Sequence, residues 1–381
     1  MKWEKVKLGE LYEVHNGLSK AGKFFGEGYP FLTFSTVFNN YFIPKQITDL
    51  VQSTEKEQES YSIRRGDVFV TRTSETSDEL GMSCVALKDY PMATYNGFTK
   101  RMRPITNRVF PEYIGYYMRL PSFRGEFRAF STMTTRASLR NEDLLGLEVK
   151  LPSIEIQKQI AGILSVYDDL IENNQKQIKL LEEAAQRLYK EWFVDLRFPG
   201  HENTKIVDGV PEGWSRGLLK ELISVNYGKD HKKAPDDGNI PVYGSGGLMR
   251  KCNKSLFSGE AVLIPRKGSL NNIMYVDETF WTVDTMFYAT MKQPHTAIFV
   301  YFFVKAFDMY SMNIGAAVPS MTTKILDAMD VVIPDKETLE KFDKYAKVYF
   351  NKIKTLQGQN ERLKIARDLL LAKLMSGEVE V

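Results

Sequence analysis

Basic residues interleaved with small polar ones are the residues of this sequence best suited to binding a charged ligand. Arginine and lysine bind phosphate oxygens and can donate to guanine edges in the DNA major groove, and threonine hydroxyls reach backbone or bases. For any single such residue, a plain solvated surface remains the commoner explanation by about two to one. Clustering in both halves of the chain nevertheless indicates two nucleic-acid contact surfaces. The candidates are Arg72, Thr73, Lys100, Arg101, Arg136 and Arg140, followed by Lys229, Lys232, Arg266 and Lys267.

Catalytic patterns do not accompany these clusters. The sequence contains no Gly-x-x-x-x-Gly-Lys-[Ser/Thr] phosphate loop, no Asn/Asp-Pro-Pro-Tyr of amino-methyltransferases and no Asp/Glu-x-Lys after the Pro-Asp pairs of common nuclease sites. Residues 244–247, Gly-Ser-Gly-Gly, could cradle a phosphate, but a turn is about three times more consistent with their context. The four histidines and two cysteines show no nucleophile or metal-ligand spacing. We therefore expect no catalytic site, metal or cofactor in this chain.

An internal repeat organises the sequence. Two blocks of residues near the start and the end of the first half recur in the second half. Between these matching blocks the halves diverge, except for a strand-like run after a glycine at residues 66–72 and 259–266. A duplicated framework with a variable interior predicts two similar domains. Trp3, Leu8, Glu10, Leu11, Val14 and Gly17 recur 211 residues later as Trp214, Leu219, Glu221, Leu222, Val225 and Gly228. Ser138, Leu144, Val149, Pro152, Glu155 and Ile171 recur 182 residues later as Ser320, Leu326, Val331, Pro334, Glu337 and Ile353.

Each half ends in a long heptad pattern. One helix of more than 40 residues is predicted to begin at an N-cap Ser153, and the other begins at Asp335 and ends near Gly377. Their offset of 182 residues is 26 heptads, so the two apolar stripes are in phase. Packing on separate domains is the alternative, but a seam of 33 residues spans roughly 50 Å, longer than a small domain is wide.

Antiparallel packing in full overlap gives a specific register. It places Asn174 opposite Asn360, Trp192 opposite Phe342, and Tyr167 opposite Arg367. We predict that the two asparagines satisfy each other and fix orientation and register at some cost in stability.

The expected fold class is α+β, with two similar strand-rich α/β domains separated by two long antiparallel helices in a coiled coil, related by an internal pseudo-twofold. The domains are expected at residues 1–152 and 214–334, the helices at 153–197 and 335–377, and a linker at 198–213. Short helices are expected at 111–120 and 296–307. No apolar run approaches the ~20 residues that cross a bilayer, and no secretory signal is recognisable, so we expect a cytoplasmic protein without membrane contact.

Together these features resemble the specificity (S) subunits of type I restriction-modification enzymes. The resemblance lies in Trp3, Leu8, Glu10 and Leu11 with their repeats, the segment 243–247, the run Arg266-Lys267-Gly268, the Pro residues leading into each long helix, and the ending at 374–378. It covers essentially the whole chain, and motif order, duplication and length agree.

This resemblance implies a non-catalytic DNA-recognition subunit. Each domain would read one half of a bipartite double-stranded DNA site, and the helices would set the spacer and dock two methyltransferase subunits. S-adenosylmethionine would be bound by those methyltransferases, and restriction subunits driven by ATP and Mg²⁺ would join the complex. Because Arg72 lacks the Lys-Gly that follows Arg266, we expect the two domains to read different sequences.

Two other functions are alternatives to DNA recognition. A solitary nuclease or a methyltransferase fragment would be an enzyme, and the missing motifs contradict it. A structural tether with two protein-binding heads is the alternative without DNA, and it would lack the steep salt dependence that phosphate neutralisation produces.

Overall fold

The computed structural model describes residues 3–74, 79–129, 137–312 and 320–381. Arg136 lies outside the described residues. The chain forms two compact units, unit 1 with Met1–Asn173 and Asn360–Val381, and unit 2 with Asn174–Gln359. Both long helices therefore contribute residues to both units. In the described part of the chain, no helix combines the length and apolarity that a membrane span requires.

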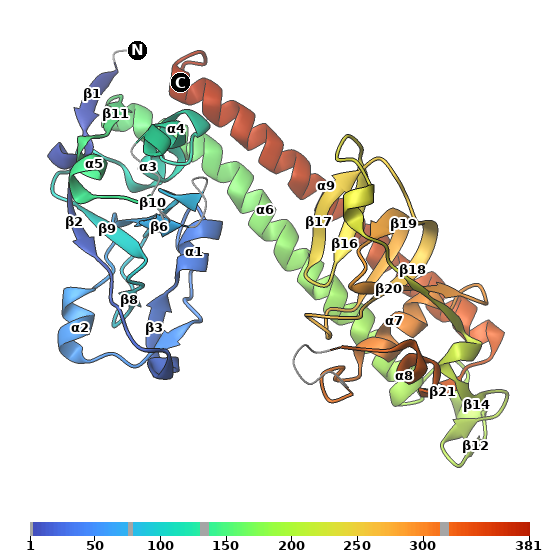
Figure 1. The fold of residues 1–381 in the computed structure, drawn as a ribbon. Helices are drawn as coiled ribbons and strands as arrows, with labels where there is room; N and C mark the ends of the chain where they lie inside the picture. The colour runs from blue at the N-terminus through green and yellow to red at the C-terminus, as the bar shows by residue number, and fades with distance from the viewer. Residues whose placement is uncertain (1–2, 75–78, 130–136, 313–319) are drawn as a thin grey trace. The chain divides into compact units, whose positions relative to one another are not determined.

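Unit 1 is built on a four-stranded sheet in the order β2-β9-β5-β7, formed by Tyr12–Asn16, Thr99–Pro104, Val68–Thr71 and Ser83–Val85 (Figure 1). A second sheet, β4-β3-β8, contains Leu50–Val51, Phe25–Leu32 and Thr94–Tyr95. Two short ribbons pair β1 (Glu4–Lys7) with β11 (Glu148–Leu151) and β6 (Thr73–Ser74) with β10 (Ala137–Ser138). Its short helices are α1 (Phe34–Asn39), α2 (Glu55–Ser60), α3 (Pro111–Tyr117), α4 (Pro121–Ala129) and α5 (Asn141–Gly146).

Unit 2 contains a six-stranded sheet in the order β15-β20-β18-β19-β16-β17. Its strands are Ile223–Tyr227, Met286–Met291, Phe257–Pro265, Met274–Thr282, Ile240–Gly244 and Gly247–Cys252. Ribbons pair β14 (Ser215–Leu218) with β21 (Asp330–Ile333) and β12 (Ile206–Val207) with β13 (Val210–Pro211). The helices α7 (Ala297–Lys305) and α8 (Thr323–Asp327) complete the unit.

Strand order shows that the sequence repeat is also a structural repeat. The order β2-β9-β5-β7 corresponds to β15-β20-β18-β19, and the ribbon β1-β11 corresponds to β14-β21. The predicted helices at 111–120 and 296–307 are present as α3 and α7. The units differ after β3 and β16, where unit 1 continues into α1 and unit 2 turns back as β17. The variable interior predicted from the sequence is therefore a change of connection on a common sheet.

One repeated glycine shows why the framework residues recur. A Cβ on Gly17 would lie 2.1 Å from the Asn96 carbonyl oxygen, and a Cβ on Gly228 would lie 2.0 Å from that of Val283. Both distances are far below van der Waals contact. Only glycine lets the chain pass this close to the neighbouring backbone.

The two long helices are α6 (Ile154–Tyr189) and α9 (Lys336–Ser376). The first has 36 α-helical residues, somewhat fewer than predicted, and continues as a π-helical turn at Lys190–Val194. The Ile156 amide lies 3.5 Å from Ser153 Oγ, and the Thr338 amide donates to Asp335 Oδ1 at 2.9 Å, so the predicted caps are in place. The second helix ends before Gly377, whose φ of 79° suits glycine.

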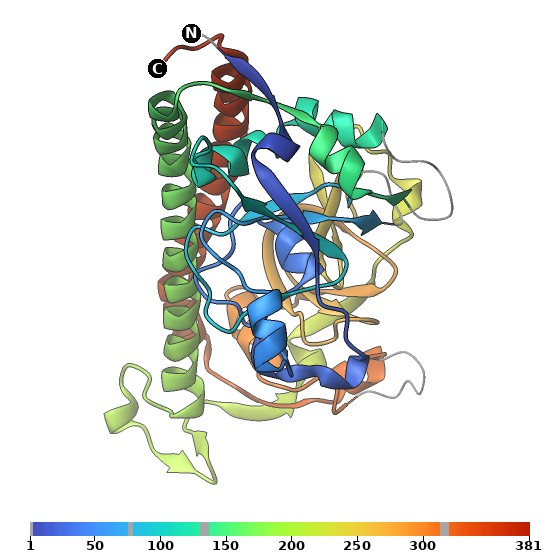
Figure 2. The same cartoon turned by 90° about the vertical axis from the view of Figure 1, so that its left-hand side faces the viewer.

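The helices α6 and α9 pack together and run antiparallel. In unit 1, Leu164 near the start of α6 shares a core with Leu374 near the end of α9. In unit 2, the ring of Trp192 just beyond α6 lies 5.9 Å from that of Phe342 near the start of α9. Figure 2 shows the two helices side by side. The predicted Trp192–Phe342 layer is confirmed, whereas the facing of Asn174 and Asn360 stays a prediction, although each is only 8% exposed.

The layer around Arg367 differs from the prediction. Its Nη1 forms an ion pair with Asp168 Oδ1, and its guanidinium lies 4.5 Å from the ring centroid of Tyr41. Tyr167 was the expected partner. Asp168 offers an opposite charge on the next residue of α6, and Tyr41 supplies the aromatic face from the globular part of unit 1. The charge is therefore neutralised where the helix seam meets the domain.

Candidate nucleic-acid interface

Arg72 and Arg266 occupy equivalent backbone positions at the ends of β5 and β18. The Arg72 amide donates to the Phe98 carbonyl at 2.9 Å, and the Arg72 carbonyl accepts from the Leu139 amide at 2.9 Å. The corresponding bonds of Arg266 join Thr285 and Met321, both at 2.8 Å. The same two hydrogen bonds thus fix both arginines, so the repeat places one candidate arginine at the same point of each domain.

The residues that follow these arginines are also equivalent. Thr73 pairs with Ser138 in the β6–β10 ribbon, and Lys267 forms a β-bridge with Ser320. Ser138 and Ser320 are themselves a repeated pair of the sequence. Thr73 is half-buried and Lys267 is exposed, so the second domain presents a cation where the first presents a hydroxyl.

Lys100 and Arg140 lie near Arg72 in unit 1. Burial, and next the charge of Arg72, lower the pKa of the Lys100 ammonium, which donates to Asn141 Oδ1 at the start of α5. Arg140 is exposed, and its Nε lies 2.9 Å from Asp143 Oδ2. The structure therefore brings Lys100 and Arg140 to the first turn of α5, with Arg72 near Lys100; of these, Lys100 is only 5% exposed.

Arg101, also a predicted DNA contact, is only 3% exposed. Successive residues of a strand point to opposite faces, so Arg101 points away from the side of β9 that carries Lys100. Its Nη1 donates to the Ser62 carbonyl at 2.8 Å, and its guanidinium lies 5.5 Å from the Tyr95 ring centroid. This burial argues against a direct contact of Arg101 with DNA and gives it a structural role.

In unit 2, Arg266 lies over an aromatic ring. Its guanidinium carbon is 5.5 Å from the Tyr227 ring centroid, and its Nη1 donates to the Asp284 carbonyl at 3.2 Å. Lys229 and Lys232 are exposed on the segment that follows β15. The carbonyl of Lys229 accepts from Trp281 Nε1 at 3.0 Å, and Asp230 caps the turn at Lys232 with a 3.0 Å hydrogen bond to the Lys232 amide.

The glycine-rich turn at residues 244–247 contributes to the same surface of unit 2. It is the β16–β17 hairpin turn, as its sequence predicted. A Cβ on Gly268 would lie 2.7 Å from Ser245 Oγ, so this turn touches the loop after Arg266. Tyr310 donates from its hydroxyl to the Gly268 carbonyl at 3.1 Å. Tyr227 and Tyr310 were missed from the sequence; a tyrosine immediately before the repeated Gly228 was the available signal.

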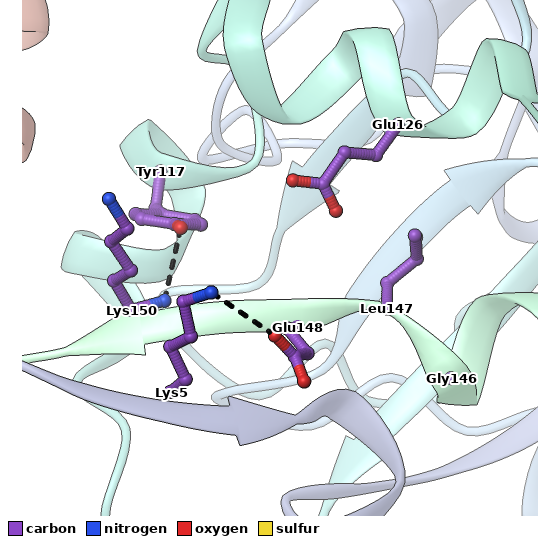
Figure 3. Close-up of a pocket in the computed structure, with 7 residues that line it drawn as sticks. All are labelled: Lys5, Tyr117, Glu126, Gly146, Leu147, Glu148 and Lys150. Atoms are coloured by element: carbon purple, nitrogen blue, oxygen red, sulfur yellow. Dashed lines mark hydrogen bonds and ion pairs between the residues drawn. The ribbon is translucent and has the colours of Figure 1, made fainter.

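A pocket of about 390 Å³ lies elsewhere in unit 1 (Figure 3). Its charged groups are arranged as a Lys5–Glu148 ion pair of 3.7 Å and a Glu126 carboxyl whose pKa is raised by burial and by Glu148. It includes none of the predicted basic residues and no nucleophile beside a base. Lining residues are Lys5, Tyr117, Glu126, Gly146, Leu147, Glu148 and Lys150.

The described ranges hold no group of three or more His, Cys, Asp or Glu side chains arranged to bind a metal. Cys84 and Cys252 are both buried thiols, and burial raises the pKa of Cys84 to about 12. Cys84 is therefore a neutral thiol at neutral pH, and Cys252 is fully enclosed in the core.

The chain consists of two similar α+β domains joined by antiparallel helices. Each domain carries an equivalent arginine at a strand end, and this arrangement defines a two-domain recognition scaffold. Residues 1–183 and 211–364 match the family model of the type I restriction modification DNA specificity domain, so the chain belongs to this family. Within a type I system it is the DNA specificity subunit, which is non-catalytic.

Relatives support this assignment over the full length. The MjaIX specificity subunit of Methanocaldococcus jannaschii is 25% identical over 423 aligned residues, covering 100% of this chain and 94% of the relative. The HindI specificity subunit of Haemophilus influenzae is 22% identical, covering 99% of both chains. A crystal structure of the S subunit from M. genitalium aligns with a TM-score of 0.55 at 17% identity, covering 98% and 96% of the two chains, which supports the fold.

Proposed function

We propose that each domain reads one half of a bipartite double-stranded DNA target. The equivalence of Arg72 and Arg266 carries this proposal, because identical backbone bonds present two arginines in different side-chain surroundings. Arg72 has Lys100 nearby, whereas Arg266 lies over Tyr227. A common frame with different neighbours suits two domains that dock alike on DNA and read different bases.

The other candidate side chains divide by chemistry. Arginines 72 and 266 are assigned to base edges, because a guanidinium can donate two parallel hydrogen bonds to guanine. Arg140, Lys229, Lys232 and Lys267 are assigned to phosphates, with Thr73 as a hydroxyl donor. Lys100 is only 5% exposed and donates to Asn141, so it is assigned a supporting role beside Arg72. Arg136 stays a predicted contact. This division predicts that Arg72 and Arg266 determine the sequence that is read, and that the phosphate contacts determine the salt dependence of binding.

Spacing of the half-sites is assigned to α6 and α9. The number of residues in a packed helix pair sets its length, because each residue advances the helix axis by ~1.5 Å. Asn174 and Asn360 are buried in a largely apolar stripe that also contains Arg367. We assign them the predicted role of fixing the register, and with it the length of the spacer.

Docking of two methyltransferase subunits is assigned to the outer faces of the same helices. Single exposed apolar residues are ordinary, but here they recur with the repeat, since Ile163 and Val166 on α6 correspond to Tyr345 and Val348 on α9. All four are exposed. In this complex, S-adenosylmethionine belongs to the methyltransferases, and ATP with Mg²⁺ belongs to the restriction subunits.

The test is co-expression with a methyltransferase subunit of a type I system, followed by single-molecule mapping of methylated adenines. A split motif with a constant gap is the expected result. Arg72→Ala should relax one half of the motif, and Arg266→Ala the other. Equal loss in both halves would contradict modular reading, and DNA affinity insensitive to salt would favour the protein-binding tether.

A further inference from the structure

Tyr227 is an exposed aromatic residue at the end of β15, and its ring packs against a buried ring of the core. The side chain is 53% exposed. Its ring meets that of Phe287 at 5.1 Å with an interplanar angle of 75°, and Phe287 on the adjacent strand β20 is fully buried. The pair is an edge-to-face contact, which favours one orientation of the exposed ring. The core of unit 2 therefore fixes the direction of the Tyr227 face.

The guanidinium of Arg266 packs over the face of the Tyr227 ring. It lies 5.5 Å from the ring centroid, within the range of a cation–π interaction. Nη1 donates to the Asp284 carbonyl at 3.2 Å, and the backbone on both sides is hydrogen-bonded to Thr285 and Met321. A guanidinium has five N–H donors in one plane. Ring and carbonyl together thus set the plane of the fork while leaving donors at a half-exposed position.

A fixed plane is what reading a guanine edge requires. Two N–H groups must reach O6 and N7 together, and an unrestrained arginine loses side-chain freedom when they do. On the proposed function of the domain, on which this inference rests, we propose that Tyr227 is a positioning residue that holds Arg266 for reading a guanine in the second half-site. Tyr227 acts through Arg266 and need not contact the base itself.

Unit 1 lacks this arrangement at the equivalent position. Tyr227 pairs with Phe287 across β15 and β20, whereas Asn16 pairs with Lys100 across β2 and β9. The ring platform is thus replaced by an amide and an ammonium group. The positioning role of Tyr227 therefore belongs to the second half-site alone, and Asn16 provides a matched control.

The experiment uses the complete complex of this chain with its methyltransferase. Methylation rates are measured on oligonucleotide duplexes carrying the mapped motif or one substituted base pair, for the wild type, Tyr227→Leu, Tyr227→Phe, Asn16→Ala and Arg266→Ala. Tyr227→Leu is expected to lower discrimination at one guanine of the second half-site by about 3- to 30-fold, the effect of losing one cation–π contact. Tyr227→Phe should keep the discrimination, because it keeps the ring. Asn16→Ala should leave that guanine read as in the wild type.

Each remaining outcome separates the inference from the proposed function. If Arg266→Ala relaxes the second half-site and Tyr227→Leu does not, the positioning role is overturned while DNA reading stands. If Arg266→Ala changes nothing, the proposed base contact itself fails. Equal weakening of both half-sites by Tyr227→Leu, a lowered melting temperature of this variant, or loss of discrimination in Tyr227→Phe would each overturn positioning by the ring.

Discussion

Adjacent residues of β9 illustrate how two similar side chains take different roles. Both are buried, but Lys100 donates to Asn141 beside Arg72, whereas Arg101 is enclosed on the other side of the strand against Ser62 and Tyr95. We expect Arg101→Met to lower the free energy of unfolding by about 1–3 kcal/mol, because it removes a charged hydrogen bond to a carbonyl in the domain interior. Urea unfolding measures this loss. The salt dependence of DNA binding should not change; a smaller salt slope with unaltered stability would restore Arg101 as a phosphate contact.

The repeated glycines allow a second test at the scale of single residues. Gly228→Ala places a methyl group 2.0 Å from the Val283 carbonyl oxygen, so backbone must move. Overpacking of this kind costs about 1–3 kcal/mol, which thermal unfolding would register. Gly246→Ala is the matched control, because nothing lies within 4 Å of its Cβ position. A Gly228 variant as stable as this control would show that the close approach is not what the repeat preserves.

At the scale of elements, the N-cap of α9 can be compared with that of α6. Of these two predicted caps, Asp335 forms the shorter hydrogen bond to its helix. Asp335 Oδ1 accepts from the Thr338 amide at 2.9 Å, and Oδ2 accepts from the Thr338 hydroxyl at 2.7 Å and from Trp214 Nε1 at 2.9 Å. Burial raises the pKa of this carboxyl, but these hydrogen bonds outweigh burial and the net pKa is lowered. The folded state therefore favours the ionised form.

A pH-dependent loss follows from this cap. Asp335→Ala is expected to cost about 1–2 kcal/mol at neutral pH. Because the folded pKa is depressed, the stabilisation is present above the unfolded pKa of ~3.9 and disappears as the pH falls through the folded value. Urea unfolding of the wild type and variant between pH 7 and pH 3 should show a converging difference. Asp335→Asn is the control, because it keeps a capping side chain without the charge. If the stability lost in Asp335→Ala were constant with pH, the carboxylate explanation would be contradicted.

Periodic patterns explain which elements could be predicted from the sequence. The stripes of α6 and α9, their caps and the strand runs around residues 66–72 and 259–266 are local signals, and each corresponds to an element of the structure. Arg367 shows where local signals end. Its ion pair with Asp168 and its contact with Tyr41 join segments far apart in sequence. The same holds for Arg101 and Tyr227, since a strand pattern does not tell which cation will be covered by a loop or placed over a ring.

For the whole complex, the exposed apolar residues predict two separable docking sites. Val166→Glu should remove one methyltransferase subunit and Val348→Glu the other, because a charge at the centre of an apolar interface stays unpaired and desolvated. Native mass spectrometry of the co-expressed complex should then show one methyltransferase per chain in place of two. Gln175→Glu, on an exposed position of α6, should keep two. Retention of both subunits in the two valine variants would place docking elsewhere.

The length of the helix pair gives the remaining prediction for the assembled molecule. Removing one heptad from α6 and one from α9 keeps both stripes in phase and shortens the pair by roughly 10 Å at ~1.5 Å per residue. Since DNA rises 3.4 Å per base pair along each strand, the methylated half-sites should move closer by about three base pairs. Removing a heptad from α6 alone would offset the two stripes and should lower stability without giving a defined shorter motif. Single-molecule mapping of methylated adenines reads the gap directly. An unchanged gap in the doubly shortened protein would show that the spacer is set by the domains themselves, because the helices are the part whose length was altered.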